Sequence, residues 1–245
     1  MSELKLFSVT HKELTRTASD RILVGVGNRQ IPNVDFYDNN GDNITEKNAN
    51  YCELTALYWI WKNVDADYIG LEHYRRYFCR KNIFKAVVLT KKKIIKILNK
   101  YDVILPRKGD LKQSVYEDYS QMHFASDLDI CRAIIELEFP EFLGDFDAVM
   151  NMHCISACNM FIMSEVLMSE YCQWLFKILF AAEQQIDLTG RNVYQSRVFG
   201  FLSERLFNVW LHHKQLKVYY APIYNVGDKP LLDKIKNKMN SIFHR

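Results

Sequence analysis

Glycine and proline are scarce in this sequence, with nine glycines and five prolines spread thinly over 245 residues. No linker rich in either residue, no internal repeat and no low-complexity block divides the chain. The composition, 49% hydrophobic and 25% charged, is that of an ordinary globular protein. We therefore expect one α/β domain over residues 1–229, with a mostly parallel central sheet flanked by helices, a helical C-terminal part, and a basic tail over residues 230–245.

The sequence also lacks the marks of secretion and of membrane spans. Its six cysteines form no CxxC pair, and its first residues, MSELKLFSVTHK, contain no apolar signal core. No apolar run reaches the roughly 20 residues that a spanning helix needs. Cys154 and Cys158 are one helical turn apart, but two thiols without further ligands make a poor zinc site. We expect a reduced, cytoplasmic protein whose membrane contact is peripheral.

Glycine-rich phosphate motifs are absent as well. The apolar run at residues 22–27, ILVGVG, predicts a strand, but it is not a GxGxxG motif and no P-loop lysine follows it. The net charge of +3 is too small to indicate nucleic-acid binding by itself. The basic stretch from Arg80 to Lys100, which includes a predicted helix at residues 91–99, suits lipid headgroups, a lipid pyrophosphate or nucleic acid, and plain solubility is the structural alternative.

The most informative stretch is residues 50–76, NYCELTALYWIWKNVDADYIGLEHYRR. It predicts an apolar helix over residues 51–62, then a buried strand at residues 68–71 that leads into Glu72, His73, Tyr74, Arg75 and Arg76. Such polar groups at the end of a buried strand are costly unless they line a cleft. In open α/β sheets the cleft lies at the carboxyl ends of the strands. The Asp65-Ala66-Asp67 triplet precedes this strand, so we expect it at the opposite edge.

Polar side chains follow other predicted elements too. The strand at residues 4–9 ends at Thr10, His11 and Lys12, a basic tip that suits either a nucleotide or plain solvent. The loop at residues 38–50 leads to a helix N-terminus, where Asn50 can cap the helix and where a phosphate or ribose could bind. Glu53 faces either the positive end of that helix or the cleft.

Later segments add candidates whose roles stay open. His153 and Asn159 lie among small and apolar residues, where a histidine serves either as a core residue or as a ligand. Residues 191–213 predict a helix in which Glu204, Arg205 and Arg197, two turns back, form either an internal ion-pair network or an acid and two cations beside a phosphate. Residues 107–124 lack a helical period and predict a lid or a disordered segment. The tail at residues 230–245 is basic and amphipathic, which suits an anionic membrane surface or docking onto the protein's own core.

Several segments carry a likeness to a known family: VTHK, DNNGDNI, NYCELTALYWIWKN, IGLEHYRRYF, YDVILP, NMFIM, EYCQWLF and QSRVFGFLSERLFNVWL. In this order they resemble a family of bacterial glycosyltransferases from capsule, exopolysaccharide and O-antigen gene clusters, long catalogued as a domain of unknown function. The resemblance covers residues 5–211, and ELTALYWIWKN and EHYRR are its most specific parts. It implies a GT-A-like, Rossmann-like domain, a UDP-sugar donor with galactose or galactofuranose favoured, and a polyprenyl-pyrophosphate-linked saccharide acceptor at the inner face of the plasma membrane.

The resemblance also implies roles for residues. GT-A enzymes carry a metal-binding DxD where this chain has Glu72 to Arg76, so the charge of the departing diphosphate would be met either by Mn²⁺ or Mg²⁺ on Glu72 or by Arg75 and Arg76 without metal. The candidate bases for the acceptor hydroxyl are Glu72, His153 and Glu204. The candidate donor-binding residues are Thr10, His11, Lys12, Asn50, Glu53, His73, Arg75, Arg76, Asn159, Gln195 and Arg205.

Two other functions remain possible from the sequence. The chain could hold a nucleotide sugar or an anionic glycan without catalysis, as a partner in a polysaccharide assembly complex. Nucleic-acid binding through residues 80–100 is disfavoured, because that stretch lacks interleaved aromatic residues except Phe84.

Overall fold

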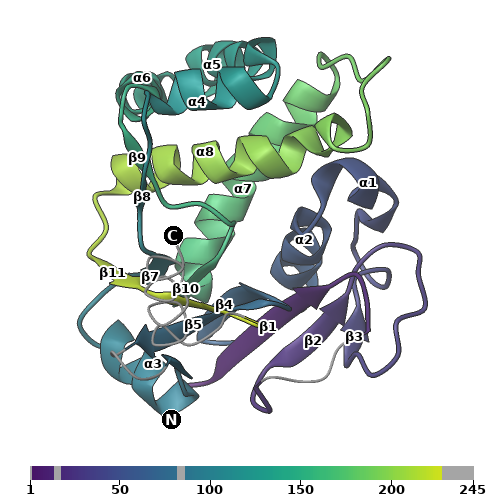
Figure 1. The fold of residues 1–245 in the computed structure, drawn as a ribbon, viewed down its shortest axis with the longest axis vertical. Coiled ribbons are helices and arrows are strands. Elements are labelled where there is room, and N and C mark those ends of the chain that lie inside the picture. Colours follow the sequence, from purple (N-terminus) through teal and green to yellow (C-terminus); the bar gives the residue numbers. More distant parts are fainter. Residues whose placement is uncertain (1, 14–17, 82–85, 228–245) are drawn as a thin grey trace, which may run out of the picture.

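A central sheet organises the chain (Figure 1). The computed structural model describes residues 2–13, 18–81 and 86–227. The strands lie in the order β11 (Val218–Ala221), β7 (Val103–Pro106), β10 (Phe161–Ser164), β4 (Tyr68–His73), β1 (Leu4–Thr10), β2 (Ile22–Gly25) and β3 (Phe36–Tyr37). All neighbouring pairs are parallel except those of β10, which is antiparallel to β4 and β7. The expected mostly parallel α/β sheet is confirmed.

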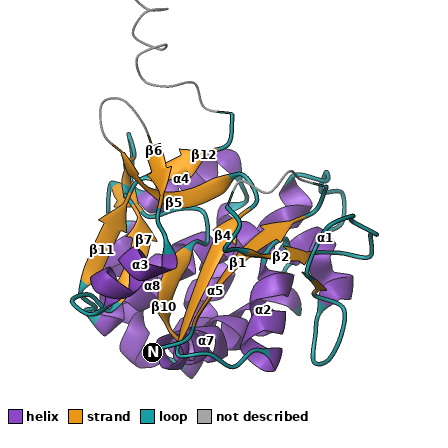
Figure 2. Cartoon of the chain, turned by 90° about the horizontal axis from the view of Figure 1, so that it is seen from below, coloured by secondary structure: helices purple, strands orange, loops and turns teal. Residues whose placement is uncertain are grey.

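A smaller antiparallel part continues from the end of β4. Strand β5 (Arg76–Lys81) pairs with β6 (Ala86–Val88) and β12 (Ile223–Asn225), and its first residue pairs with His73. Figure 2 shows these strands together at one end of the sheet. A separate ribbon joins β8 (Gly109–Asp110) to β9 (Cys154–Ile155).

Helices cover both faces of the sheet, most of them on one side. The larger layer contains α1 (Asn48–Tyr51), α2 (Leu54–Asn63), α4 (Val115–Met122), α5 (Ala125–Glu138), α6 (Leu143–Met150), α7 (Glu165–Glu183) and α8 (Val198–Lys214). Short 3-10 turns, η1 (Thr45–Lys47), η2 (Pro140–Phe142) and η3 (Gln195–Arg197), precede α1, α6 and α8. The other face carries α3 (Lys91–Leu98). None of the helices in the described residues is long and apolar enough to cross a bilayer.

Side-chain alternation along the strands divides the core into two layers. Val103 and Leu105 pack under the larger helical layer, whereas Ile104 between them packs against α3. This period of two is what a sheet buried on both faces requires. The Leu6 side chain of β1 covers Gly70 of β4, because a Cβ at residue 70 would be 2.5 Å from Leu6 Cδ2.

Two expectations about helices were wrong. The apolar run at residues 51–62 is not one helix, because Cys52 has a φ of 53° and separates α1 from α2. Residues 107–124 are not disordered and do contain a helix, since they form β8 and α4, and α4 begins with a capping box between Ser114 and Glu117. Ser164 caps the N-terminus of α7, with its Oγ accepting from Leu167 N. The predicted tail at residues 230–245 lies outside the described residues.

Candidate functional site

The polar strand ends that the sequence singled out lie at one edge of the sheet. Strand β1 ends at Thr10, and β4 beside it ends at His73, which is in register with Val9. The antiparallel β10 starts at this edge with Phe161, two residues after Asn159. The expected cleft position, at the carboxyl ends of the parallel strands, is therefore where these residues gather.

Positive side chains surround Tyr74 at this edge. The His11 ring meets the Tyr74 ring edge-on at 5.2 Å, and Lys12 Nζ and Arg75 Cζ lie 5.4 and 4.9 Å from the Tyr74 centroid. Burial, together with the charges of Lys12, Arg29, Arg75 and Arg197, lowers the pKa of His11. We call Lys12, Arg29 and Arg75, together with the His11 ring beside them, the cation group; the positive charge comes from the lysine and the two arginines. Such a concentration of like charge is suited to an anionic ligand.

Tyr74 itself supports a ligand in this place. Its side chain is only 8% exposed, and its Oη has no hydrogen-bond partner within the described part of the chain. Buried polar atoms are almost always paired, so a hydroxyl without a partner among the described residues, placed next to cations, is compatible with a polar ligand at this edge. The Thr10 hydroxyl, by contrast, already has a partner, because it donates to Lys12 O and stabilises the turn after β1.

A cavity of about 650 Å³ adjoins the cation group through Arg29. It is lined by Asn28, Arg29, Gln30, Ile31, Pro32, Tyr37 and Asn39, after the ends of β2 and β3. Tyr37 Oη shapes its wall by donating to Ile31 O and accepting from Ile31 N. This cavity was not predicted from the sequence. The polar run Asn28-Arg29-Gln30, directly after a predicted strand, could have indicated it.

Two carboxylates are attached to one turn at the same edge. Glu204 Oε1 accepts from Cys158 N at 2.9 Å, and Glu53 Oε1 accepts from Asn159 Nδ2 at 2.9 Å. Burial raises the pKa of Glu204, Arg205 opposes the rise, and the negative charge of Glu53 adds to it. A carboxylate of raised pKa is suited to general base catalysis. We call Glu53 and Glu204 the carboxylate pair.

The backbone around the carboxylate pair is strained. Cys52, Cys158 and Asn159 have φ values of 53°, 85° and 43°, and Cys52 directly precedes Glu53. A left-handed conformation costs a residue other than glycine about 1 kcal/mol or more, and such residues gather at functional sites. His73 Nε2 lies 2.6 Å from Cys158 O, so β4 supports this turn.

Glu72 does not face the site, which corrects its predicted roles as base and metal ligand. Its side chain is 0% exposed and forms two hydrogen bonds with Arg21, at 2.7 Å from Nε and 3.2 Å from Nη2. Its Oε1 also accepts from Phe78 N at 2.7 Å. All of these partners are structural, so Glu72 stabilises the junction of β4 and β5.

His153 also lies elsewhere. It is exposed on the turn between α6 and β9, and its charge helps to lower the pKa of Glu117, after the larger effect of the hydrogen bonds from Ser114. The structure does not bring His153 to the carboxylate pair or to the cation group. His153 is therefore not in a position to act as the base for the acceptor hydroxyl.

The remaining predicted residues divide between the site and its supports. Arg75 and Arg76 are both exposed, Arg75 within the cation group and Arg76 with Nη1 3.4 Å from Cys158 Sγ. Arg205 Nη1 donates to Glu204 Oε2 at 3.1 Å. Asn50 and Gln195 join elements instead, because Asn50 Nδ2 donates to Ser196 O and Gln195 Nε2 donates to Met122 O.

The donor set at this edge does not fit a protein-held metal ion. Among the residues that the structure describes, no three His, Cys, Asp or Glu side chains are grouped to hold one. The carboxylate pair offers two groups, and both already accept hydrogen bonds from the chain. The Asp65-Ala66-Asp67 triplet precedes β4 at the opposite edge, where Asp67 Oδ2 accepts from Glu3 N.

Comparison with known proteins supports the fold. The chain is similar to a solved structure described as "WbbM bifunctional glycosytransferase apo structure", with a TM-score of 0.84 and 28% sequence identity. The match covers 92% of this chain and 46% of that chain, so this chain spans about half the length of the WbbM structure. No curated protein matches. A family described as "Domain of unknown function (DUF4422)" matches residues 5–215. The chain belongs to this family.

Proposed function

We propose that the chain is a glycosyltransferase that moves a hexosyl group, with galactose or galactofuranose favoured, from a UDP-sugar to a lipid-linked glycan in capsule, exopolysaccharide or O-antigen synthesis. The observation that carries the proposal is the cation group around Tyr74, whose hydroxyl has no partner among the described residues, with the carboxylate pair at the same sheet edge. The match to half of a bifunctional glycosyltransferase supports it.

In this proposal the donor lies across the cavity and the cation group. The nucleoside occupies the cavity beside Arg29, and the diphosphate lies against Lys12, Arg75 and the Tyr74 hydroxyl. Negative charge grows on the diphosphate as its bond to the anomeric carbon breaks. Fixed cations that are already in position stabilise this charge without reorganising. Guanidinium groups match the geometry of phosphate oxygens especially well.

Glu204 is the base in the proposed inverting transfer. The acceptor oxygen forms its bond to the anomeric carbon while the electron pair of the broken bond goes to the diphosphate, and the hydroxyl proton goes to the Glu204 carboxylate. Hydrogen bonds from Cys158 N and Arg205 Nη1 hold this carboxylate in place. Because the cations meet the leaving-group charge, we propose that the transfer requires neither Mn²⁺ nor Mg²⁺.

The proposed location is the inner face of the plasma membrane, where a polyprenyl-pyrophosphate-linked acceptor would be found. The basic composition of residues 230–245 supports peripheral binding to anionic lipid. The exposed lysines Lys92, Lys93 and Lys96 on α3 add positive charge to the surface.

UDP release tests the proposal against a purely binding function. UDP-, GDP- and dTDP-sugars are first screened by thermal shift, since a ligand of the native state raises the apparent stability. The preferred donor is then incubated with octyl β-D-galactopyranoside or a membrane lipid extract as acceptor. Acceptor-dependent release of UDP supports a transferase, and a thermal shift without release in any acceptor supports the binding alternative. Glu204→Gln should keep the thermal shift and lose the release.

A further inference from the structure

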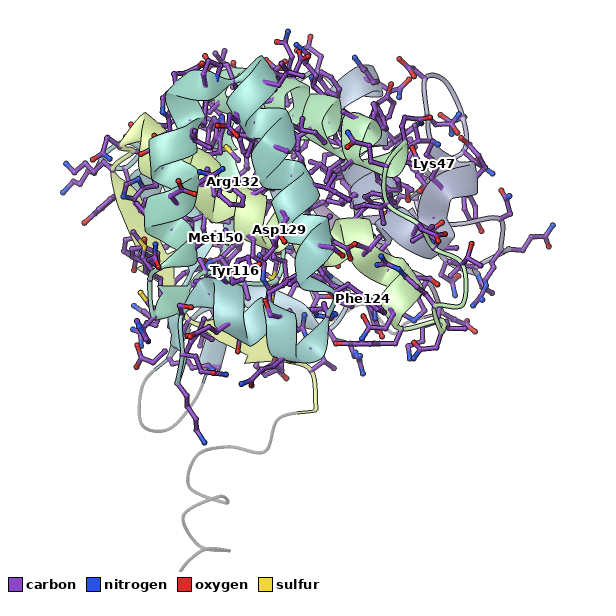
Figure 3. All side chains as sticks on the ribbon, turned by 90° about the horizontal axis from the view of Figure 1, so that it is seen from above. Lys47, Tyr116, Phe124, Asp129, Arg132 and Met150 are labelled. Carbon is purple, nitrogen blue, oxygen red and sulfur yellow. The ribbon has the colours of Figure 1, made fainter. Side chains whose placement is uncertain are left out.

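Exposed apolar side chains gather where the α4–α5 junction meets the segment before α8. Met122 and Phe124 are 46% exposed, Tyr194 is 51% exposed and Val193 is 86% exposed. Figure 3 shows Phe124 between the teal α4–α5 region and the green segment that leads to α8. Soluble proteins rarely expose such groups together unless they bind something. We call Met122, His123, Phe124, Val193, Tyr194 and Phe201 the aromatic platform.

The rings of the aromatic platform are held in fixed positions. The His123 ring stacks on Phe201 at 4.1 Å and on Tyr194 at 5.7 Å, and Tyr194 lies 5.0 Å from Phe201. Gln195 fixes this arrangement, because its Oε1 lies 3.1 Å from His123 Nδ1 and its Nε2 donates to Met122 O. A ligand on these rings would therefore meet a surface that is already organised.

The chemistry of the aromatic platform suits a neutral ring with hydroxyl groups. Burial lowers the pKa of His123, which favours the uncharged imidazole, so the stacked rings are themselves neutral while Arg191 and Arg197 border them. Polar groups border the rings: Arg191 lies 4.4 Å over Phe124, and Asn192 is exposed beside Val193. A hexopyranose has an apolar C–H face that packs on an aromatic ring and hydroxyl groups at its rim, and the two surfaces are complementary.

The aromatic platform is continuous with the carboxylate pair. Phe201 and Glu204 are three residues apart on α8, so they lie on the same side of the helix. Arg197 lies 5.4 Å over Phe201 and donates through Nε to Cys52 Sγ at 3.1 Å, next to Glu53. A sugar on the platform would thus be a neighbour of the proposed base, which is the position that an acceptor needs.

We propose that the aromatic platform is the subsite for a sugar ring of the glycan acceptor, with the Tyr194 ring as its main stacking surface. The proposal rests on the proposed transferase function, which makes an acceptor glycan necessary. It also assigns Gln195 as a positioning residue that orients His123, in place of its predicted contact with the donor.

Tyr194→Ala and Tyr194→Phe test the platform in two independent ways. For transfer to octyl β-D-galactopyranoside, Tyr194→Ala should raise the acceptor KM roughly tenfold, the order expected for one aromatic stacking contact. Tyr194→Phe should stay near the wild type because it keeps the ring. The donor-induced thermal shift should be equal in all variants. Leu137→Ala, at an exposed apolar residue on α5, is the matched control.

Saturation-transfer NMR with the same galactoside reads binding without turnover, so it separates this proposal from the transferase proposal. Loss of the saturation signal in Tyr194→Ala, even in a protein that shows no transfer, supports the platform as a sugar site. An unchanged signal and an unchanged acceptor KM overturn it. The proposal is equally overturned if Tyr194→Ala instead weakens co-sedimentation with phosphatidylglycerol vesicles and leaves galactoside binding intact, because the platform would then contact a membrane.

Discussion

Replacing Glu72 distinguishes a structural from a catalytic carboxylate. Glu72 is fully buried, and its two hydrogen bonds with Arg21 join β4 to the segment before β2. Removing one partner of a buried ion pair costs about 3–5 kcal/mol, because the other charge stays buried. Losing the acceptor for Phe78 N–H adds about 1–3 kcal/mol. Glu72→Ala should therefore lose about 4–8 kcal/mol, much of the roughly 5–15 kcal/mol of a typical domain.

Glu72→Gln is the sharper variant because its carbonyl oxygen can still accept from Phe78 N–H. It should cost at most about 3–5 kcal/mol in the free energy of unfolding, because the buried Arg21 loses Glu72 but keeps its ion pair with Asp20, whose Oδ1 lies 2.7 Å from Arg21 Nη1. Arg21→Met should also destabilise. The double variant Arg21→Met/Glu72→Gln should be more stable than the sum of the single changes by about 1–3 kcal/mol, since neither charge is then left alone.

Urea unfolding followed by tryptophan fluorescence measures these energies, and sugar transfer is measured in parallel. Glu3→Gln, at an exposed carboxylate, is the control and should change little. Transfer per folded molecule should be retained in Glu72→Gln. Normal stability with lost transfer would refute the structural role and return Glu72 to the chemistry, and strictly additive energies in the double variant would refute the coupling with Arg21.

Three further predictions concern the proposed site. Arg75→Ala should weaken the donor-induced thermal shift and lower kcat at least tenfold without changing the urea midpoint, whereas Arg80→Ala, an exposed arginine on β5, should change neither. Glu204 must be deprotonated to act as a base, so the activity should decrease as the pH falls below the raised pKa of Glu204. Glu53→Gln removes a negative charge that raises this pKa, so the acid limb of the kcat/KM profile should move to lower pH. Sugar transfer should continue in the presence of EDTA. A requirement for added Mn²⁺ would contradict the proposal that cationic side chains stabilise the departing diphosphate without a metal ion.

Local patterns were enough to predict the sheet and the edge where the site lies. Strand positions follow from short apolar runs between polar segments, and the polar residues at the ends of β1 and β4 pointed to the edge where the cation group and the carboxylate pair lie. The sequence could not distinguish Glu72 from its neighbour His73, because the difference depends on Arg21, which is 51 residues away in the chain. The position of a buried charge partner depends on the tertiary structure, so the local sequence pattern cannot predict it.

The break between α1 and α2 had the same cause. Residues 51–62 are apolar at helical spacing, so propensity favours one continuous helix. The local pattern does not show that α8 packs closely against Cys52. A Cβ on Gly200 of α8 would lie 3.5 Å from both Cβ and Sγ of Cys52. The positive φ of Cys52 places Glu53 within hydrogen-bond distance of Asn159. The conformational cost of this positive φ is offset by contacts between segments that are distant in the sequence.

The Cys158-Asn159 turn explains why these distant segments behave as one unit. Asn159 Nδ2 donates to Glu53 from α2's start and to Gly200 O on α8, while its Oδ1 accepts from Ser203 Oγ. Cys158 N holds Glu204, and Cys158 O contacts His73 at the end of β4. The two carboxylates are thus held by one turn, Glu204 through the backbone of Cys158 and Glu53 through the side chain of Asn159, and two helices and a strand hold this turn in place. Such support is what a preorganised site requires, and it accounts for strain being retained at this turn.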